Sequence, residues 1–189
     1  MARRAGNLSG APCFTNTVGA WDMNDKNNTT KTVVSAMFRE VFVALADELD
    51  CKKSQVPAYL GISYDIFIKI YELGKIPRPQ ILARIADKFN CSVEFLLGRT
   101  KDQSFERSQK NASFTERLTE LENRYGKTDY YVSSKLHVST NYITNWRKKN
   151  YTPSFDILLT IADLFSTSLD YLLGRTDDCE PYEIVPDWN

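Results

Sequence analysis

Apolar residues recur along the chain at the spacing of one helix face. Four of them fall at i, i+4, i+7 and i+11 in the second half of the sequence: Phe114, Leu118, Leu121 and Tyr125. This spacing places all four on one side of an α-helix. Ser113, followed three residues later by Glu116, has the pattern of a capping box and predicts where the helix begins. The same stripe occurs earlier, at Phe38, Phe42, Leu45 and Leu49.

The two stripes belong to a longer internal repeat. The pentapeptide LLGRT occurs at 96–100 and again at 172–176. An offset of 76 aligns residues 38–100 with 114–176 without a gap, and 19 of the 63 pairs are identical, including the IAD triplets at 85–87 and 161–163. Chance gives about one identity in seventeen, so the sequence predicts a duplicated unit.

Each unit is predicted to contain five helices. A short second helix ends at Leu60 or Leu136, and a tight turn leads to a third helix capped by Ser63 or Ser139. Pro57 falls inside the second helix of the first unit and predicts a late start there. The fourth helix follows Pro77 or Pro153. It has apolar residues at helical spacing, which are Ile81, Leu82, Ile85 and Phe89 in the first unit and Ile157, Leu158, Ile161 and Phe165 in the second. Gly98 or Gly174 ends the fifth helix. The fold class is therefore all-α.

This pattern divides the chain into five segments. Residues 1–33 are rich in Gly, Asn and Thr and are expected to be largely disordered. Residues 34–100 form the first domain, 101–113 a polar linker, 114–176 the second domain, and 177–189 an acidic tail.

Charge and composition exclude several classes of protein. Lys plus Arg equals Asp plus Glu, but the tail holds five acids and no base, so the rest of the chain has 24 basic and 19 acidic residues. The four cysteines lack close spacing and there is one histidine, which argues against a zinc site and for reduced thiols. No apolar run approaches the ~20 residues of a membrane span. A cytoplasmic protein without cofactors is expected.

Helix, three-residue turn and helix within about 65 residues is the geometry of a helix-turn-helix DNA reader. The stretch LHVSTNYITNWRKKN…P…IADLF…SLDYLLGRT resembles the Cro/phage-repressor (XRE-like) type of helix-turn-helix regulator. This resemblance covers both units. It implies two tandem lambda-repressor-like domains that bind double-stranded DNA, a transcription regulator that represses, and neither an enzyme nor a small-molecule receptor.

The resemblance assigns roles to residues of the second unit. Ile143 and Trp146 match the buried side of the third helix, and His137 occupies a turn position that is usually glycine, where a left-handed backbone is expected. The residues predicted to contact bases are Thr140, Asn141, Tyr142 and Asn145. Those predicted to contact phosphates are Lys127, Thr128, Ser139, Arg147, Lys148 and Lys149.

The first unit departs from this pattern. Its third helix carries Ile66, Ile68 and Leu73 where polar residues are expected, and Asp65 and Glu72 repel phosphate. Residues that could still contact DNA are Lys52, Lys53, Ser63, Tyr64 and Lys69. Two interpretations stay open: a second DNA reader, or a surface for dimerisation or for a protein partner, as in antitoxin-like systems. The segment Tyr71–Gly74 also resembles the aromatic-Glu-x-Gly segment of the family if one residue is inserted in the helix.

The acidic tail and the question of catalysis complete the analysis. The tail could fold back on the basic face and compete with phosphate, or form a solubilising end. An enzyme is disfavoured because the chain has one histidine, no glycine-rich phosphate loop after a strand and no convincing strand.

Overall fold

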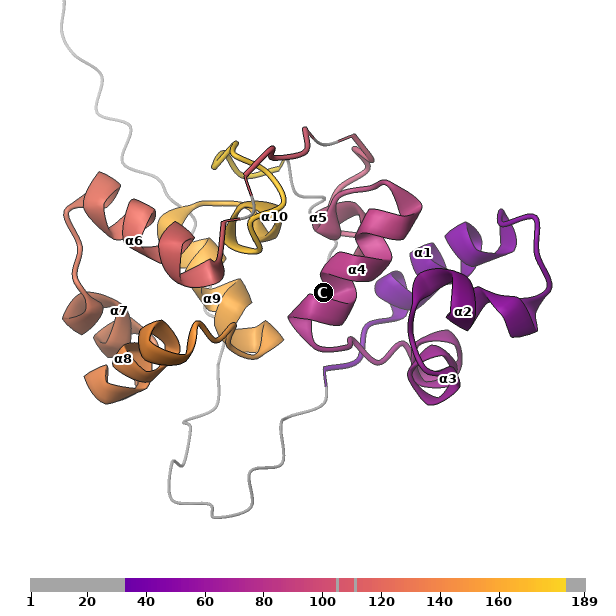
Figure 1. The fold of residues 1–189 in the computed structure, drawn as a ribbon, viewed down its shortest axis with the longest axis horizontal. Coiled ribbons are helices and arrows are strands. Elements are labelled where there is room, and N and C mark those ends of the chain that lie inside the picture. The colour runs from indigo at the N-terminus through magenta and orange to yellow at the C-terminus, as the bar shows by residue number, and fades with distance from the viewer. Residues whose placement is uncertain (1–32, 105, 111, 183–189) are drawn as a thin grey trace, which may run out of the picture.

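The computed structural model describes residues 33–104, 106–110 and 112–182, which fold into α-helices joined by short turns (Figure 1). The first half consists of α1 (Ala36–Asp47), the 3-10 turn η1 (Lys53–Gln55), α2 (Val56–Leu60), α3 (Tyr64–Leu73), α4 (Pro79–Phe89) and α5 (Val93–Leu96). The second half consists of α6 (Phe114–Tyr125), α7 (Asp129–Lys135), α8 (Thr140–Lys149), α9 (Phe155–Phe165) and α10 (Leu169–Leu172). The predicted all-α class is confirmed. The segment expected to be disordered lies, apart from Val33, outside the described residues.

The helices of the two halves follow the sequence offset closely. The bounds of α3, α4 and α5 lie 76 residues before those of α8, α9 and α10. Gly74 after α3 and Asn150 after α8 are equivalent C-caps, with φ angles of 62° and 46°. No residue is therefore inserted in α3, and the gapless alignment holds through the third helix.

The second helix is where the halves differ most. Pro57 is buried in the first turn of α2, which starts only at Val56 after η1, whereas α7 is an uninterrupted helix of seven residues. Proline lacks the N–H that an earlier helical start would use, so its tolerated place is the first turn. The predicted late start is confirmed.

Serine hydroxyls cap five of the helices in the described ranges: α1, α3, α5, α6 and α10. Ser63 accepts a hydrogen bond from the backbone N–H three residues on, as predicted for the N-cap of the third helix, and Ser92 and Ser168 do the same for α5 and α10. Ser113 and Glu116 form the predicted capping box. Ser139 occupies the N-cap of α8, but its side chain makes no capping hydrogen bond, so the expectation of a hydroxyl cap there is wrong.

The buried apolar residues form one core cluster to which both halves contribute. In the first half, Phe38, Phe42 and Phe67 are fully buried, and Phe42 lies about 6 Å from the rings of the other two. In the second half the cluster contains Leu118, Leu121, Ile143, Trp146, Leu158, Ile161 and Leu172. The third helix of each half therefore rests on a packed core, which fixes the side that it presents outward.

The described part of the acidic tail, 177–182, packs on the second half. Asp177 accepts hydrogen bonds from Arg117 of α6 and, at 2.9 Å, from Ser108. Thr167, before α10, donates to the carbonyl of Cys179 at 2.7 Å. These contacts lie at α6 and α10, so this part of the tail does not cover α8; Glu183 and Asp187 lie outside the described residues.

Candidate nucleic-acid interface

Helices α7 and α8 meet at a tight turn at the lower left of Figure 1. His137 adopts a left-handed conformation with φ 54°, as the sequence predicts, and the N–H of Val138 donates to the carbonyl of Ser133 at 2.9 Å. This hydrogen bond closes the end of α7. The chain then enters α8 at Thr140.

The inner side of α8 is apolar. Ile143 is fully buried and Trp146 is 3% exposed, which confirms the prediction that both belong to the core. The indole packs edge-on against Phe114 of α6 and Tyr142, with ring centroids 5.8 and 5.4 Å apart. These contacts prevent α8 from rotating about its axis, because rotation would expose the tryptophan.

The outer side of α8 is polar and accessible to solvent. Five side chains on it are exposed: Thr140, Asn141, Asn145, Lys148 and Lys149. Tyr142, with 47% of its surface exposed, borders this side. The structure thus brings together all four residues predicted to contact bases, and the amides and hydroxyls among them are groups that hydrogen-bond base edges in the major groove.

Arg147 occupies a different environment from the lysines that follow it. Its guanidinium donates to Asp129 of α7 at 2.7 Å, and to Glu122 and Thr119 of α6 at 2.5 Å each. Its side chain is 27% exposed. Although the sequence predicts a phosphate contact, the arginine here joins α8 to α6 and α7, and its hydrogen-bond donors point into the protein.

This cluster contains two carboxylates and one guanidinium. Burial raises the pKa of Glu122 to about 7, the positive charge of Arg147 opposes this, and the neighbouring carboxylate of Asp129 adds to it. The pKa of Arg147 is raised by the same two acids, although burial acts against that shift. The positive charge of Arg147 is therefore largely balanced within the cluster, and Lys148 and Lys149 supply the exposed charge of α8.

The other predicted phosphate contacts surround the start of α7 and α8. Thr128 is the N-cap of α7, and the ammonium of the exposed Lys127 lies 4.6 Å from the centroid of the Tyr131 ring. Ser139 is exposed at the start of α8. The sequence did not single out Tyr130 and Tyr151, which are 75% and 55% exposed; their only signal was their place inside the basic stretch 127–151.

Helix α3 of the first half presents a different surface. Lys69 pairs with Asp65 at 2.8 Å, and Lys53 lies 3.8 Å from Glu72 and 3.4 Å from the centroid of the Tyr71 ring. Two of the lysines proposed to contact DNA thus face acids or an aromatic ring. Lys52, Ser63 and Tyr64 are exposed.

The isoleucines of α3 are not the exposed apolar surface that their sequence positions predict. Ile66 and Ile68 are half-buried and pack against the core. Leu73, the third apolar residue that the sequence singles out, is 60% exposed, and Tyr64 at the start of α3 is 62% exposed. Any protein contact through α3 would use these two residues.

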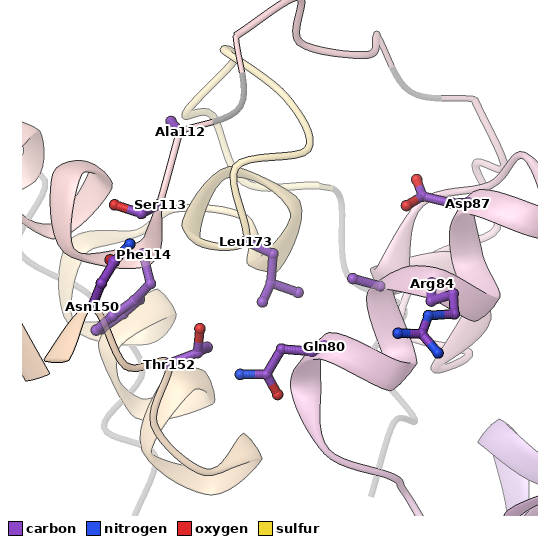
Figure 2. A pocket seen from close by; sticks show the side chains of 10 residues that line it. Gln80, Arg84, Asp87, Ala112, Ser113, Phe114, Asn150, Thr152 and Leu173 are labelled. Carbon is purple, nitrogen blue, oxygen red and sulfur yellow. The ribbon is translucent and has the colours of Figure 1, made fainter. Parts of the chain in front are cut away.

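A cleft of about 430 Å³ separates α4 from the second half. Figure 2 shows Leu173 pointing into this cleft and Gln80 of α4 facing Thr152 across it. Within the described ranges, no group of three or more His, Cys, Asp or Glu side chains could hold a metal ion. None of the helices in the same ranges has the length and apolar character to cross a membrane.

Comparisons with known proteins point to helix-turn-helix regulators. The chain is 32% identical over 65 residues to the HTH-type transcriptional regulator ImmR of Bacillus subtilis (strain 168), a match covering 34% of this chain and 51% of that protein. It is 28% identical over 68 residues to YobD, an uncharacterized HTH-type transcriptional regulator of the same strain, covering 36% of this chain and 61% of that protein. The chain thus spans between half and two thirds of the length of these relatives. No protein-family model matches, and no solved structure matches with significance.

Proposed function

We propose that the chain is a sequence-specific transcription regulator that binds double-stranded DNA through α8 and represses by occupying its site. One observation carries the proposal: a polar, exposed helix side, with Thr140, Asn141 and Asn145, is held outward by the burial of Ile143 and Trp146. A helix of this kind, presented after a tight turn, fits the major groove. The names of the two relatives support the same class of function.

The side chains of α8 divide into two roles. Asn141 and Asn145 can each pair with N6 and N7 of an adenine, while Thr140 and Tyr142 can contact a thymine methyl group or the sugar edge. Phosphate contacts come from the exposed residues around them: Lys127, Thr128, Tyr130, Ser139, Lys148, Lys149 and Tyr151. Arg147 is left out of this set because its donors are engaged inside the protein.

The first half supports a second candidate function, a protein-interaction or antitoxin-like module. The observation that favours it is α3, where Lys69 is paired with Asp65 and Leu73 is exposed beside Glu72. Such a surface lacks the uncompensated positive charge that phosphate contacts require. If the partner is a second copy of the chain, Leu73→Asp converts a dimer to a monomer in sedimentation, while Lys148→Asp on the other half does not. If the unaltered chain is a monomer, the partner of this surface is a different protein.

Selection of binding sites from random duplex DNA tests the proposal. If α8 alone reads bases, the recovered sequences share one short motif without two-fold symmetry. If α3 also reads bases, a second motif appears at a fixed distance, on the order of one helical turn or ~34 Å. Recovered sequences with no shared motif at moderate salt would overturn the assignment of base contacts to α8.

A further inference from the structure

The two halves contact each other through the starts of their last helices. The N–H of Val93, the first residue of α5, donates to the carboxylate of Asp170 in α10 at 2.8 Å. The N–H of Leu169, the first residue of α10, donates to the carboxylate of Glu94 in α5. Positions 93 and 169, and positions 94 and 170, are both 76 residues apart. Each half therefore caps the last helix of the other with the same position of its own sequence.

A second exchange involves the repeated motifs. Arg175, the arginine of the second LLGRT, pairs with Asp87 of the first IAD at 3.1 Å. Arg99, the arginine of the first LLGRT, pairs with Asp163 of the second IAD at 3.7 Å. Contacts in which position i meets j and j meets i define a two-fold, isologous interface. Here both sides of such an interface belong to one chain.

The charged groups of this contact are removed from solvent. Asp170 is fully buried, Glu94 is 3% exposed, and Arg99 and Arg175 are 6% and 7% exposed. Burial, followed by repulsion from Asp170, raises the pKa of Glu94 well above its ordinary value. Charges buried in this way depend on their partners. Asp87 belongs to α4 and borders the cleft of Figure 2, so the exchange joins the two halves beside that cleft.

The sequence repeat is concentrated in this contact. Of the 20 positions 81–100, 12 are identical to their equivalents at 157–176. Over α3 and α8, by contrast, none of the ten equivalent pairs is identical. The two halves thus share the residues that dock and differ in the residues that they present outward.

We propose that the α5 and α10 surfaces are self-complementary, and that either one can dock onto the same surface of a second copy of this chain when its internal partner is disabled. The α10 surface contains every group that the exchange needs: Asp163 and Arg175, and Asp170 with the N–H of Leu169. Two copies of it can satisfy each other about a two-fold axis. In the intact chain the internal contact prevails, because the connecting segment keeps the two surfaces at an effective concentration in the millimolar range.

The test uses full-length variants and sedimentation over a concentration series. Asp87→Arg with Glu94→Lys places positive charge against Arg175 and the N-terminus of α10, so the internal contact opens and the α10 surfaces pair between chains. The mass then doubles, while the unaltered chain remains a monomer at micromolar concentration. The mirror variant, Asp163→Arg with Asp170→Lys, should dimerise through the α5 surface. If one of the two variants has a folding defect in the altered half, the other variant still tests the proposal.

The variant that combines all four substitutions is the matched control. It has no intact docking surface and should be monomeric. If the double-substitution variants instead associate through exposed core residues, this variant should associate at least as strongly as they do. The proposal is overturned if both double-substitution variants are monomers and circular dichroism shows that they retain their helix content. A dimer of the four-fold variant, or an unaltered chain that is already a dimer at micromolar concentration, overturns it as well.

Discussion

Arg147 of α8 donates hydrogen bonds to Asp129 of α7 from two nitrogens: Nε donates to both carboxylate oxygens at 3.1 and 3.3 Å, and Nη2 donates to Oδ1 at 2.7 Å. The equivalent positions of the first half, Tyr71 and Lys53, also contact each other, with the ammonium 3.4 Å from the ring centroid. Both halves therefore join the second and third helical segments at the same two positions by different chemistry. This contact fixes the angle at which the third helix is presented.

Replacing Arg147 by glutamine separates a positioning role from a phosphate contact, because the substitution removes the positive charge. The neutral amide cannot reproduce the charged fork, so the free energy of unfolding should fall by ~1–3 kcal/mol. DNA affinity should fall with it because α8 is less well held, but the dependence of affinity on salt should keep its slope. Denaturant titration and DNA binding at several salt concentrations measure both. A slope that drops by about one unit would restore the phosphate contact that the sequence predicts.

Asn145→Ala and Lys148→Ala should affect DNA binding in different ways. Loss of the Asn145 amide should cost ~1–3 kcal/mol on the preferred sequence and relax the choice at one base pair. Loss of the Lys148 charge should weaken binding to all sequences alike and flatten the salt slope by about one unit. Competition titrations with preferred and scrambled duplexes distinguish the two. Equal losses on every duplex from both variants would contradict the division into base and phosphate contacts.

Stability should depend on pH through Glu122. Its pKa rises from 4.5 to about 7 in the folded protein, so between these values the folded state holds a proton that the unfolded state has lost. The resulting stabilisation is complete below 4.5 and is lost as the pH rises to about 7, a change of at most about 3 kcal/mol.

Glu122→Gln isolates this dependence, because glutamine keeps an oxygen for Arg147 and does not titrate. The difference in unfolding free energy between the unaltered chain and the variant, measured by denaturant titration across the same pH range, should decline steadily as pH rises. A constant difference would show that Glu122 titrates alike in the folded and unfolded states.

Much of the fold follows from local sequence signals. Serine caps, the prolines and the periodic apolar stripes predict the helices. The resemblance to helix-turn-helix regulators, through Ile143 and Trp146, predicts which side of α8 is buried. These signals suffice because each helix start and each buried stripe is encoded within a few residues of one another. Ser139, whose hydroxyl makes no cap, shows that the residue type alone does not fix the bond.

The contacts between segments could not be predicted in this way. Arg147, Lys148 and Lys149 are three consecutive basic residues, and nothing local distinguishes them. Arg147 nevertheless pairs with Asp129 and Glu122, which lie 18 and 25 residues earlier in the chain. The docking of Glu94 on Leu169 joins positions 75 residues apart. Neither partner has a local pattern that marks the other, since only the packing of the helices brings them together.

The turn before α8 offers a last test, at His137. Its φ of 54° lies in the left-handed region, where a side chain costs energy, and the first half has Gly61 with φ 66° at the equivalent position. His137→Gly should therefore raise the free energy of unfolding by up to ~1 kcal/mol. Gly61→Ala should lower it by ~1 kcal/mol, since the nearest atom to an added Cβ is Arg84 Cδ at 3.6 Å and sterics contribute little. Thermal and denaturant unfolding of both variants measures the pair, and destabilisation by His137→Gly would mean that the imidazole makes a stabilising contact that outweighs the backbone strain.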